Sequence, residues 1–311
     1  MPSASDRDRI VVPDVDEAIR VGKLGAGRPT HPTHARYALG LAALLAGPAA
    51  AQDTAALLPL INAYRDAPRQ CEGKRHPAAG PLAPVAVLGE VPVGSGSELM
   101  DVLKGRGYLA ARAAMLSTSG VGSAEAVMRF LKARSCRTLL DSGFAEIGVG
   151  RRGARWQIVL AQPLLSPNLP GWREAGQAIL EHTNTARATS QRCGDRTFAA
   201  APPLVWDAEL GAAARVHSRD MARRNRFEHS GPQGGQAGSR ATRAGYAWRR
   251  VGENIAAGQG SAAQVSAAWL ASPQHCVNIM NPKFTQMGAA FDVTRSSDAG
   301  IYWTRVFGTP K

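Results

Sequence analysis

The feature that most constrains this fold is a set of residues that recurs in the same order in both halves of the chain. When residues 61–73 (INAYRDAPRQCEG) are laid over residues 183–195 (TNTARATSQRCGD), an asparagine, an arginine and a cysteine coincide. The matches continue in order: Pro81-Leu82 with Pro203-Leu204, Gly107-Tyr108 with Gly245-Tyr246, Ser123 with Ser261, Cys136 with Cys276, residues 144–150 with 284–290, and residues 156–160 with 303–307. Self-similarity of this kind predicts a tandem of two related domains.

The repeat divides the chain of 311 residues into four segments. We predict a leader over residues 1–51, a first domain over 52–163, a Pro-rich linker over 164–175 and a second domain over 176–311. The distance from Cys71 to Gly107 is 36 residues, whereas that from Cys193 to Gly245 is 52, so the first copy is 16 residues shorter here. The first domain is therefore predicted to be a shortened copy.

The four cysteines permit three disulfide pairings. The repeat favours one of them, Cys71 with Cys136 and Cys193 with Cys276, which places one bridge in each domain. Four free thiols are the alternative. Cysteine ligation of a metal is disfavoured, because no two cysteines are close in sequence.

The leader contains a segment typical of a secretory signal peptide. Arg36 precedes an apolar run over residues 37–45, and small residues follow at 49–51, which predicts cleavage between Ala51 and Gln52. A buried helix of the fold is the alternative. A signal peptide implies an oxidising compartment in which disulfides persist, so we predict a secreted or periplasmic protein. The mature chain contains no apolar run long enough to span a bilayer.

The charge of the chain indicates anionic neighbours. Its net charge is +13, mostly from arginine, which favours contact with anionic polymers of a cell surface. We find neither zinc-finger spacing nor the aromatic motifs of RNA-binding domains, so no specific nucleic-acid partner is expected.

The pattern of the second domain predicts an α+β fold. Helices are expected over 176–188, after an Asp207 N-cap, after Ser261, and after Ser272-Pro273, with a loop over 230–243 and strands over 287–293 and 301–307. Helices followed by a closing hairpin favour a small antiparallel sheet covered by helices.

Five polar residues of the second domain are candidates for a site: His217, His229, Glu253, Ser272 and His275. Each has a structural alternative, such as a buried core histidine for His217, a helix cap for Ser272 and a turn acceptor for Glu253. The first domain provides an internal comparison, because Met115 occupies the position of Glu253 and Ser135 that of His275. The polar set therefore occurs only in the second copy, which favours a site.

Several segments of the second domain resemble a known family. They are AARVHSRDMARRNRFEHSG (213–231), VGENIAAG (251–258), AAWLASPQHCVNIMNPKFTQMG (267–288) and YWTRVFG (302–308). In order and spacing they resemble the CAP superfamily of cysteine-rich secretory, antigen 5 and pathogenesis-related 1 proteins, also called the SCP domain, and in particular its bacterial branch. The first domain resembles this family only through the repeat, as a degenerate copy.

The resemblance implies tandem α-β-α sandwiches, the second with a central cleft. In eukaryotic members the cleft holds two histidines and two acidic residues and can bind a divalent metal. His229 and Glu253 match the first histidine and acid, but Ser272 and Lys283 stand where the second pair would be. His217 and His275 belong to the bacterial pattern.

Two functions follow from the resemblance, and no catalytic residue is assigned. The first is a non-catalytic module that binds a small apolar, lipid-like or envelope-derived ligand in the second cleft. The alternative is a metal-dependent hydrolase in which His229, Glu253 and His275 hold a divalent ion such as zinc. We expect these three side chains to converge, with Ser272 and His217 at the rim. The first domain alone is a candidate spacer or dimer surface.

Overall fold

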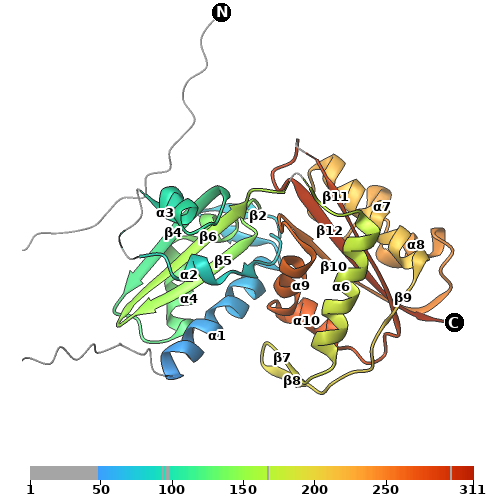
Figure 1. The fold of residues 1–311 in the computed structure, drawn as a ribbon, viewed down its shortest axis with the longest axis horizontal. Coiled ribbons are helices and arrows are strands. Elements are labelled where there is room, and N and C mark those ends of the chain that lie inside the picture. The colour runs from blue at the N-terminus through green and yellow to red at the C-terminus, as the bar shows by residue number, and fades with distance from the viewer. Residues whose placement is uncertain (1–47, 93, 95–97, 167, 295) are drawn as a thin grey trace, which may run out of the picture. The chain divides into compact units, whose positions relative to one another are not determined.

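The computed structural model describes residues 48–311, apart from residues 93, 95–97, 167 and 295 (Figure 1). The described residues belong to one compact unit. The predicted apolar run of the signal peptide, residues 37–45, lies outside the described residues. The predicted cleavage position after Ala51 falls within the first helix, α1 (Pro48–Arg65).

The N-terminal half, residues 48–163, continues after α1 with two short strands that form a small hairpin, and with a mixed sheet and four further helices. Its elements are β1 (Arg69–Cys71), β2 (Lys74–His76), β3 (Ala83–Pro84), α2 (Ala86–Gly89), α3 (Leu99–Gly105), β4 (Ala110–Ser119), α4 (Ala124–Arg134), α5 (Cys136–Leu139), β5 (Glu146–Arg152) and β6 (Arg155–Pro163).

The C-terminal half, residues 172–310, repeats this order with one added 3₁₀ turn, and two of its five helices are longer than their N-terminal counterparts. Its elements are α6 (Trp172–Arg187), β7 (Gln191–Cys193), β8 (Arg196–Phe198), β9 (Val205–Trp206), α7 (Ala208–Arg224), the 3₁₀ turn η1 (Pro232–Gly234), α8 (Ala237–Arg243), β10 (Trp248–Ala257), α9 (Ala262–Leu270), α10 (Pro273–Met280), β11 (Gln286–Val293) and β12 (Ile301–Pro310). The protein is thus α+β, as predicted.

The two four-stranded sheets have the same strand order. The order is β3-β5-β6-β4 in the N-terminal half and β9-β11-β12-β10 in the C-terminal half. In both, the long strands pair antiparallel, whereas the two-residue strand at the edge pairs parallel. The sheet is therefore not wholly antiparallel, because the short edge strand enters by a crossover and not by a hairpin.

Helices cover both faces of the C-terminal sheet. On β12, Thr304 accepts a hydrogen bond from Ser218 of α7, whereas the next residue, Arg305, donates to Thr183 of α6. Because successive strand residues point to opposite faces, α7 and α6 lie on opposite sides of the sheet. The main core lies under α6, α9 and α10 and contains Trp269 and Trp303.

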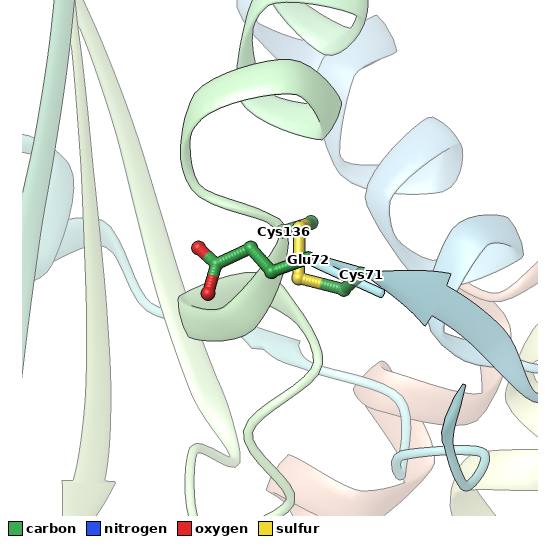
Figure 2. A group of neighbouring side chains, drawn as sticks. All are labelled: Cys71, Glu72 and Cys136. Carbon is green, nitrogen blue, oxygen red and sulfur yellow. A yellow bond between two sulfur atoms is a disulfide. The ribbon is translucent and has the colours of Figure 1, made fainter. Parts of the chain in front are cut away.

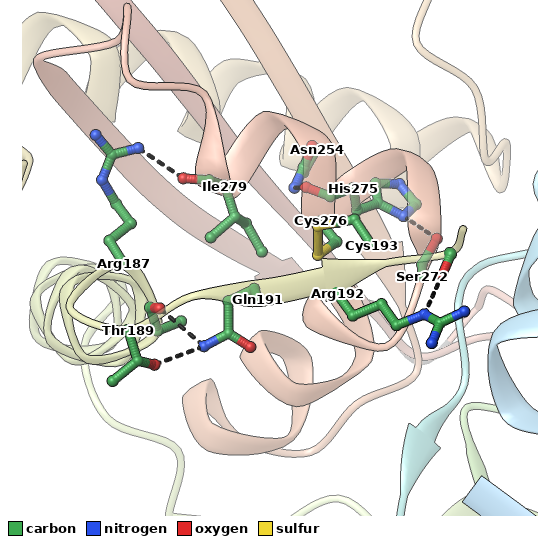
Figure 3. Close-up of a disulfide and its surroundings, with 12 residues drawn as sticks. Arg187, Thr189, Gln191, Arg192, Cys193, Asn254, Ser272, His275, Cys276 and Ile279 are labelled. Atoms are coloured by element: carbon green, nitrogen blue, oxygen red, sulfur yellow. Dashed lines mark hydrogen bonds between the residues drawn. A yellow bond between two sulfur atoms is a disulfide. The ribbon is translucent and has the colours of Figure 1, made fainter. Parts of the chain in front are cut away.

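Both predicted disulfides are present. Cys71 is bonded to Cys136 (Figure 2), and Cys193 is bonded to Cys276 (Figure 3). The bridges join residues 65 and 83 positions apart. Loops of this length correspond to a stabilisation of roughly 4–5 kcal/mol in the chain-entropy treatment. The described residues contain no free cysteine.

Each half contains one buried arginine that donates hydrogen bonds to backbone carbonyls at corresponding positions. Arg65 donates through its guanidinium to the carbonyls of Gly80, Leu139, Asp141 and Phe144. Arg187 donates in the same way to Pro202, Ile279, Asn281 and Phe284. These carbonyls include the last turn of α10, whose final C=O groups have no partner within the helix. Arg187 therefore joins α6, the loop after β8, and the end of α10.

Three details differ from the sequence prediction. Helix α6 begins at Trp172, inside the predicted linker, and its first residue, Trp172, packs against the hydrophobic core. The predicted loop over 230–243 contains α8, which Gln236 and Ser239 cap reciprocally. Glu253 lies in the long strand β10, which the sequence analysis did not predict, and this strand excludes the turn that was the alternative for Glu253. Within the described part of the chain, no helix is long and apolar enough to cross a membrane.

Replacing Arg187 by Met tests the role of its guanidinium. The variant keeps the length of the side chain but leaves several buried carbonyls without donors, so the free energy of unfolding should fall by about 2–4 kcal/mol. Denaturant titration measures the change. Arg223→Met, an exposed arginine on α7, is the matched control and should change stability little. Equal stability of the two variants would show that the hydrogen bonds of Arg187 do not stabilise the fold.

Candidate functional site

The carboxylate of Glu253 is the centre of the polar cluster in the C-terminal half. It projects from β10 on the face covered by α7 and α8, and only 4% of its side chain is exposed. Arg240 of α8 donates to Oε2 over 2.6 Å, and Nδ1 of His229 lies 2.8 Å from Oε1. Because a carboxylate only accepts hydrogen bonds, Nδ1 of His229 carries a proton and its Nε2 remains available to solvent.

Arg240 also orders the loop beside Glu253. Its guanidinium donates to the carbonyls of Gly235 and His229, at 2.8 and 3.1 Å. Helix α7 ends at Asn225, whose left-handed backbone (φ 48°) redirects the chain toward His229. One arginine thus fixes both the carboxylate and the loop that carries its histidine partner.

The charge of Glu253 is balanced inside the protein. Burial alone would raise the pKa of this carboxyl, but the hydrogen bond from His229 and the positive charges around it hold the pKa below its usual range. Glu253 is therefore ionised near neutral pH and already neutralised by its neighbours. This arrangement leaves little of its charge for a further cation.

His217 lies on α7 beneath the carboxylate. Its side chain is fully buried, its Nε2 is 3.7 Å from Oε1 of Glu253, and neither ring nitrogen has a hydrogen-bond partner. Burial lowers the pKa of His217 to about 4, although the charge of Glu253 opposes this effect. At neutral pH this imidazole is uncharged. Because its side chain is fully buried, the prediction that His217 lies at the rim of the cleft is wrong.

An open cavity of about 470 Å³ lies in front of Glu253 and His229. Its lining is completed by Gln236, Ala237, Gly238, Ser239, Trp248, Val251 and Gly252. The Trp248 indole is fixed over Gly238 and donates through Nε1 to the Thr242 hydroxyl at 3.0 Å. A Cβ at residue 238 would approach this ring to 2.8 Å, so glycine is needed there.

His275 and Ser272 form a second polar group, on α10 (Figure 3). Nδ1 of His275 is 2.8 Å from the Ser272 hydroxyl, and Nε2 is 3.9 Å from Oδ1 of Asp66 in the N-terminal half. Ser272 occupies the N-cap position of α10, but its hydroxyl binds the His275 ring instead of capping the helix. It is completely buried, so the expectation that it lies at the rim is also wrong.

The structure thus brings together part of the predicted set. His229, Glu253 and His217 form one cluster, while His275 and Ser272 contact each other and face Asp66. Their roles as ligand or metal residues stay predictions. Lys283, at the position of the second histidine, is exposed. Sequence reasoning missed Arg240, which lies in a segment interpreted as loop, and Asp66, which belongs to the other half.

The sequence of the C-terminal half matches a known family. Residues 180–307 fit the Cysteine-rich secretory protein family, CAP. The match covers the segment in which the motifs around Glu253 and His275 resemble the bacterial branch of this family, and residues 180–307 are referred to below as the CAP domain.

Individual proteins are similar to parts of this chain. The chain is similar to the Uncharacterized protein YkwD of Bacillus subtilis, with 36% identity over 105 residues, or 34% of this chain, and it spans 39% of that relative's length. Among solved structures it is similar to an extracellular protein containing a SCP domain from Bacillus anthracis, with 19% identity over 68% of this chain and 70% of that one (TM-score 0.39). An outer surface protein from Borrelia burgdorferi has 18% identity over 45% and 95% of the two chains (TM-score 0.37).

Replacing Arg240 by Met should leave Glu253 as a buried carboxylate without its strongest partner. We expect a loss of about 3–5 kcal/mol in the free energy of unfolding and a rise in the pKa of Glu253. The double variant Arg240→Met with Glu253→Gln should be more stable than the single variant, because no buried charge remains. Arg243→Met, an exposed residue of the same helix, is the control. A double variant no more stable than Arg240→Met would contradict the pairing.

The lowered pKa of His217 predicts a loss of stability in mild acid. The unfolded chain takes up this proton near pH 6.5 and the folded protein only near pH 4, so the stabilisation present above pH 6.5 is lost as the pH falls toward 4. The slope from this residue is at most ~1.4 kcal/mol per pH unit. Urea titrations across this range should show a smaller slope for His217→Gln than for wild type, with exposed His182→Gln as control. Identical slopes would mean that the pKa of His217 is not lowered in the folded protein.

Proposed function

We propose that this protein is a secreted or periplasmic binding module whose CAP domain takes a small apolar or envelope-derived ligand, without catalysis. The observation that carries the proposal is the open cavity of about 470 Å³ in front of Glu253 and His229. This volume lies in the range of small-molecule sites, which combine apolar walls with a few fixed polar groups. Trp248 and Val251 provide apolar surface, and Gln236 and His229 provide hydrogen-bonding groups.

The electrostatics of the cavity favour an uncharged or amphipathic ligand. The carboxylate of Glu253 is already compensated by Arg240 and His229, so a bound cation would compete with two established partners. The apolar walls suit an acyl or other hydrocarbon group, and the free Nε2 of His229 suits a polar head. Such a ligand agrees with the lipid-like class that the family resemblance implies.

The bonding and burial of the candidate nucleophiles among the described residues do not favour covalent catalysis. All four cysteines are in disulfides, and Ser272, the serine next to a histidine, has no exposed surface. Nucleophilic catalysis requires an accessible, activated side chain. The two disulfides also support an oxidising compartment, in line with the predicted signal peptide.

A metal-dependent hydrolase using His229, Glu253 and His275 is the second candidate, and one observation favours it. Glu253 holds Nδ1 of His229 and leaves Nε2 free on a side chain that is 53% exposed. A histidine oriented by a carboxylate in this way presents its free ring nitrogen as a metal ligand. Zinc-dependent ester hydrolysis that disappears in His229→Gln would favour this candidate over simple binding.

We further propose that the N-terminal half is a degenerate copy of the CAP domain. Support comes from the shared strand order and the paired Arg65 and Arg187 networks. Asn62 and Asn184 likewise each exchange two hydrogen bonds with the backbone of a leucine 20 residues later. The family match itself covers only the C-terminal half.

Filling the cavity tests the proposed function. Val251→Trp should occupy the space beside Trp248 and weaken binding of a fluorescent long-chain fatty acid by roughly tenfold or more, measured by fluorescence titration. The matched control is Val216→Trp, because Val216 lies on α7 with 60% of its surface exposed, away from the cavity lining. Wild-type protein that does not bind the probe, or equal binding by both variants, would contradict this proposal.

A further inference from the structure

A second cavity, of about 340 Å³, is lined by residues from both halves of the chain. The N-terminal half contributes Pro77, Ala78, Gly80 and Ser142, and the other eight lining residues belong to the CAP domain. None of these residues lines the cavity in front of Glu253. Neither half forms this second cavity alone, so it is a property of the tandem.

The N-terminal wall of this cavity is fixed by the buried Arg65. Its guanidinium donates to the carbonyl of Gly80 at 2.7 Å and to that of Asp141, the residue before Ser142, at 3.1 Å. The two N-terminal segments that line the cavity are 62 residues apart in sequence, from Gly80 to Ser142. One arginine therefore sets the position of both.

Hydrogen bonds between the two halves hold this wall against the CAP domain. The buried Gln259 donates to the carbonyls of Pro81 and Ala145, at 2.7 and 3.2 Å. Gln162, near the end of β6, donates to the carbonyl of Asp298 at 2.9 Å. Both bonds involve a lining residue or a close neighbour of one, so the two walls of the cavity are joined directly.

The wall from the CAP domain is fixed by Asn225, the residue that ends α7. Its Oδ1 accepts from the Tyr302 hydroxyl at 2.9 Å and from the backbone N–H of Asp298 at 3.1 Å. Its Nδ2 donates to Oδ2 of Asp298 at 3.1 Å. The end of α7 and the loop before β12 are thus tied together, and the cavity exists before any ligand enters.

One part of the lining is apolar. Phe227 packs in the same apolar cluster as Ala299 and Tyr302. Pro77 and Ala78 add apolar surface from the N-terminal half. These walls suit an aliphatic or aromatic group of a ligand.

The rest of the lining carries both signs of charge. Asp298 and Glu228 each engage one carboxylate oxygen within the protein, with Asn225 and Arg224 respectively, and the second oxygen is left for a ligand. Arg226 is exposed, and its guanidinium has no partner among the described residues. Because carboxylates only accept hydrogen bonds and guanidinium groups only donate them, the lining offers partners for an ammonium group and for a carboxylate.

We propose that this cavity binds a short peptide with free ends and apolar side chains. Its ammonium group contacts Asp298 and Glu228, its carboxylate contacts Arg226, and its side chains lie against Phe227 and Ala78. Charge-assisted hydrogen bonds of this kind fix the orientation of a ligand. A fatty acid supplies no cation for the two carboxylates, so this site differs in chemistry from the cavity in front of Glu253 and goes beyond the function proposed for it.

Calorimetric titration of the full chain with the dipeptide leucyl-phenylalanine tests the site. Wild type should bind one dipeptide, and Ala78→Trp, which fills the cavity from the N-terminal half, should weaken binding roughly tenfold or more. The matched control is Ala133→Trp, because Ala133 is exposed on α4 of the same half and is not part of the lining. Circular dichroism checks that each variant is folded.

Two charge variants test how the dipeptide is oriented. Asp298→Asn keeps an oxygen that accepts from Asn225 but removes the charge, so it should weaken leucyl-phenylalanine roughly threefold to fivefold, as expected for exposed ion pairs. The N-acetylated dipeptide lacks the ammonium group, so Asp298→Asn should not weaken it further. Arg226→Gln should likewise weaken the free dipeptide and spare the amidated one. Asp101→Asn, an exposed carboxylate on α3, is the control.

The outcomes separate this proposal from the previous one. Absence of binding by wild type at about 1 mM dipeptide, or equal binding by Ala78→Trp and Ala133→Trp, would overturn it. Equal losses for the free and acetylated dipeptides in Asp298→Asn would also overturn it. Val251→Trp should bind the dipeptide normally while losing the fatty acid, and Ala78→Trp should do the reverse, so the two sites fail independently.

Discussion

The architecture of the CAP domain depends on the burial of one carboxylate. An ionised group without partners in a protein interior costs several kcal/mol, so Glu253 can remain in β10 only if cations are brought to it. Arg240 comes from α8 and donates to Oε2, whereas His229 comes from the loop after α7 and donates to Oε1. The cavity in front of Glu253 is the space that these segments leave once they are fixed. Its location therefore follows from an electrostatic requirement.

The backbone around this site also depends on buried arginines, which donate hydrogen bonds to carbonyl groups. Arg187 is surrounded by carbonyl groups, two of them from the end of α10 and the residue after it. By satisfying acceptors that a helix cannot satisfy itself, it fixes the C-terminal end of α10. The N-terminal turn of the same helix carries Ser272 and His275. The orientation of His275 toward Asp66 is thus set at both ends of one short helix.

The sequence predicted the α+β class, helices α7, α9 and α10, and the closing hairpin, because these depend on local caps and periodicity. The register of the internal repeat predicted both disulfides. The sequence did not predict the strand that carries Glu253, because the partner of this strand, β12, lies far along the chain and pairs with Glu253 at Val306. The sequence analysis identified Arg65 and Arg187 only as identical residues of the repeat. It did not predict their hydrogen bonds to carbonyl groups, which lie up to 97 residues away along the chain. Asp66 could not be found, because no local pattern indicates which half it faces.

The comparison of the two halves explains why the polar site occurs only once. In the sheets, Met115 is paired with Val159 as Glu253 is with Val306, and the position of Arg240 in the repeat register corresponds to Val102. Val102 and Met115 pack into the same apolar cluster of the N-terminal half. There the helix after β3 ends after one turn, at Gly89, whereas α7 continues past His217 to Arg224. A carboxylate at residue 115 would lack its cations, and an apolar pair is the stable replacement for a buried ion pair. The carboxylate, its arginine and the long helix α7 must therefore be present together or be absent together.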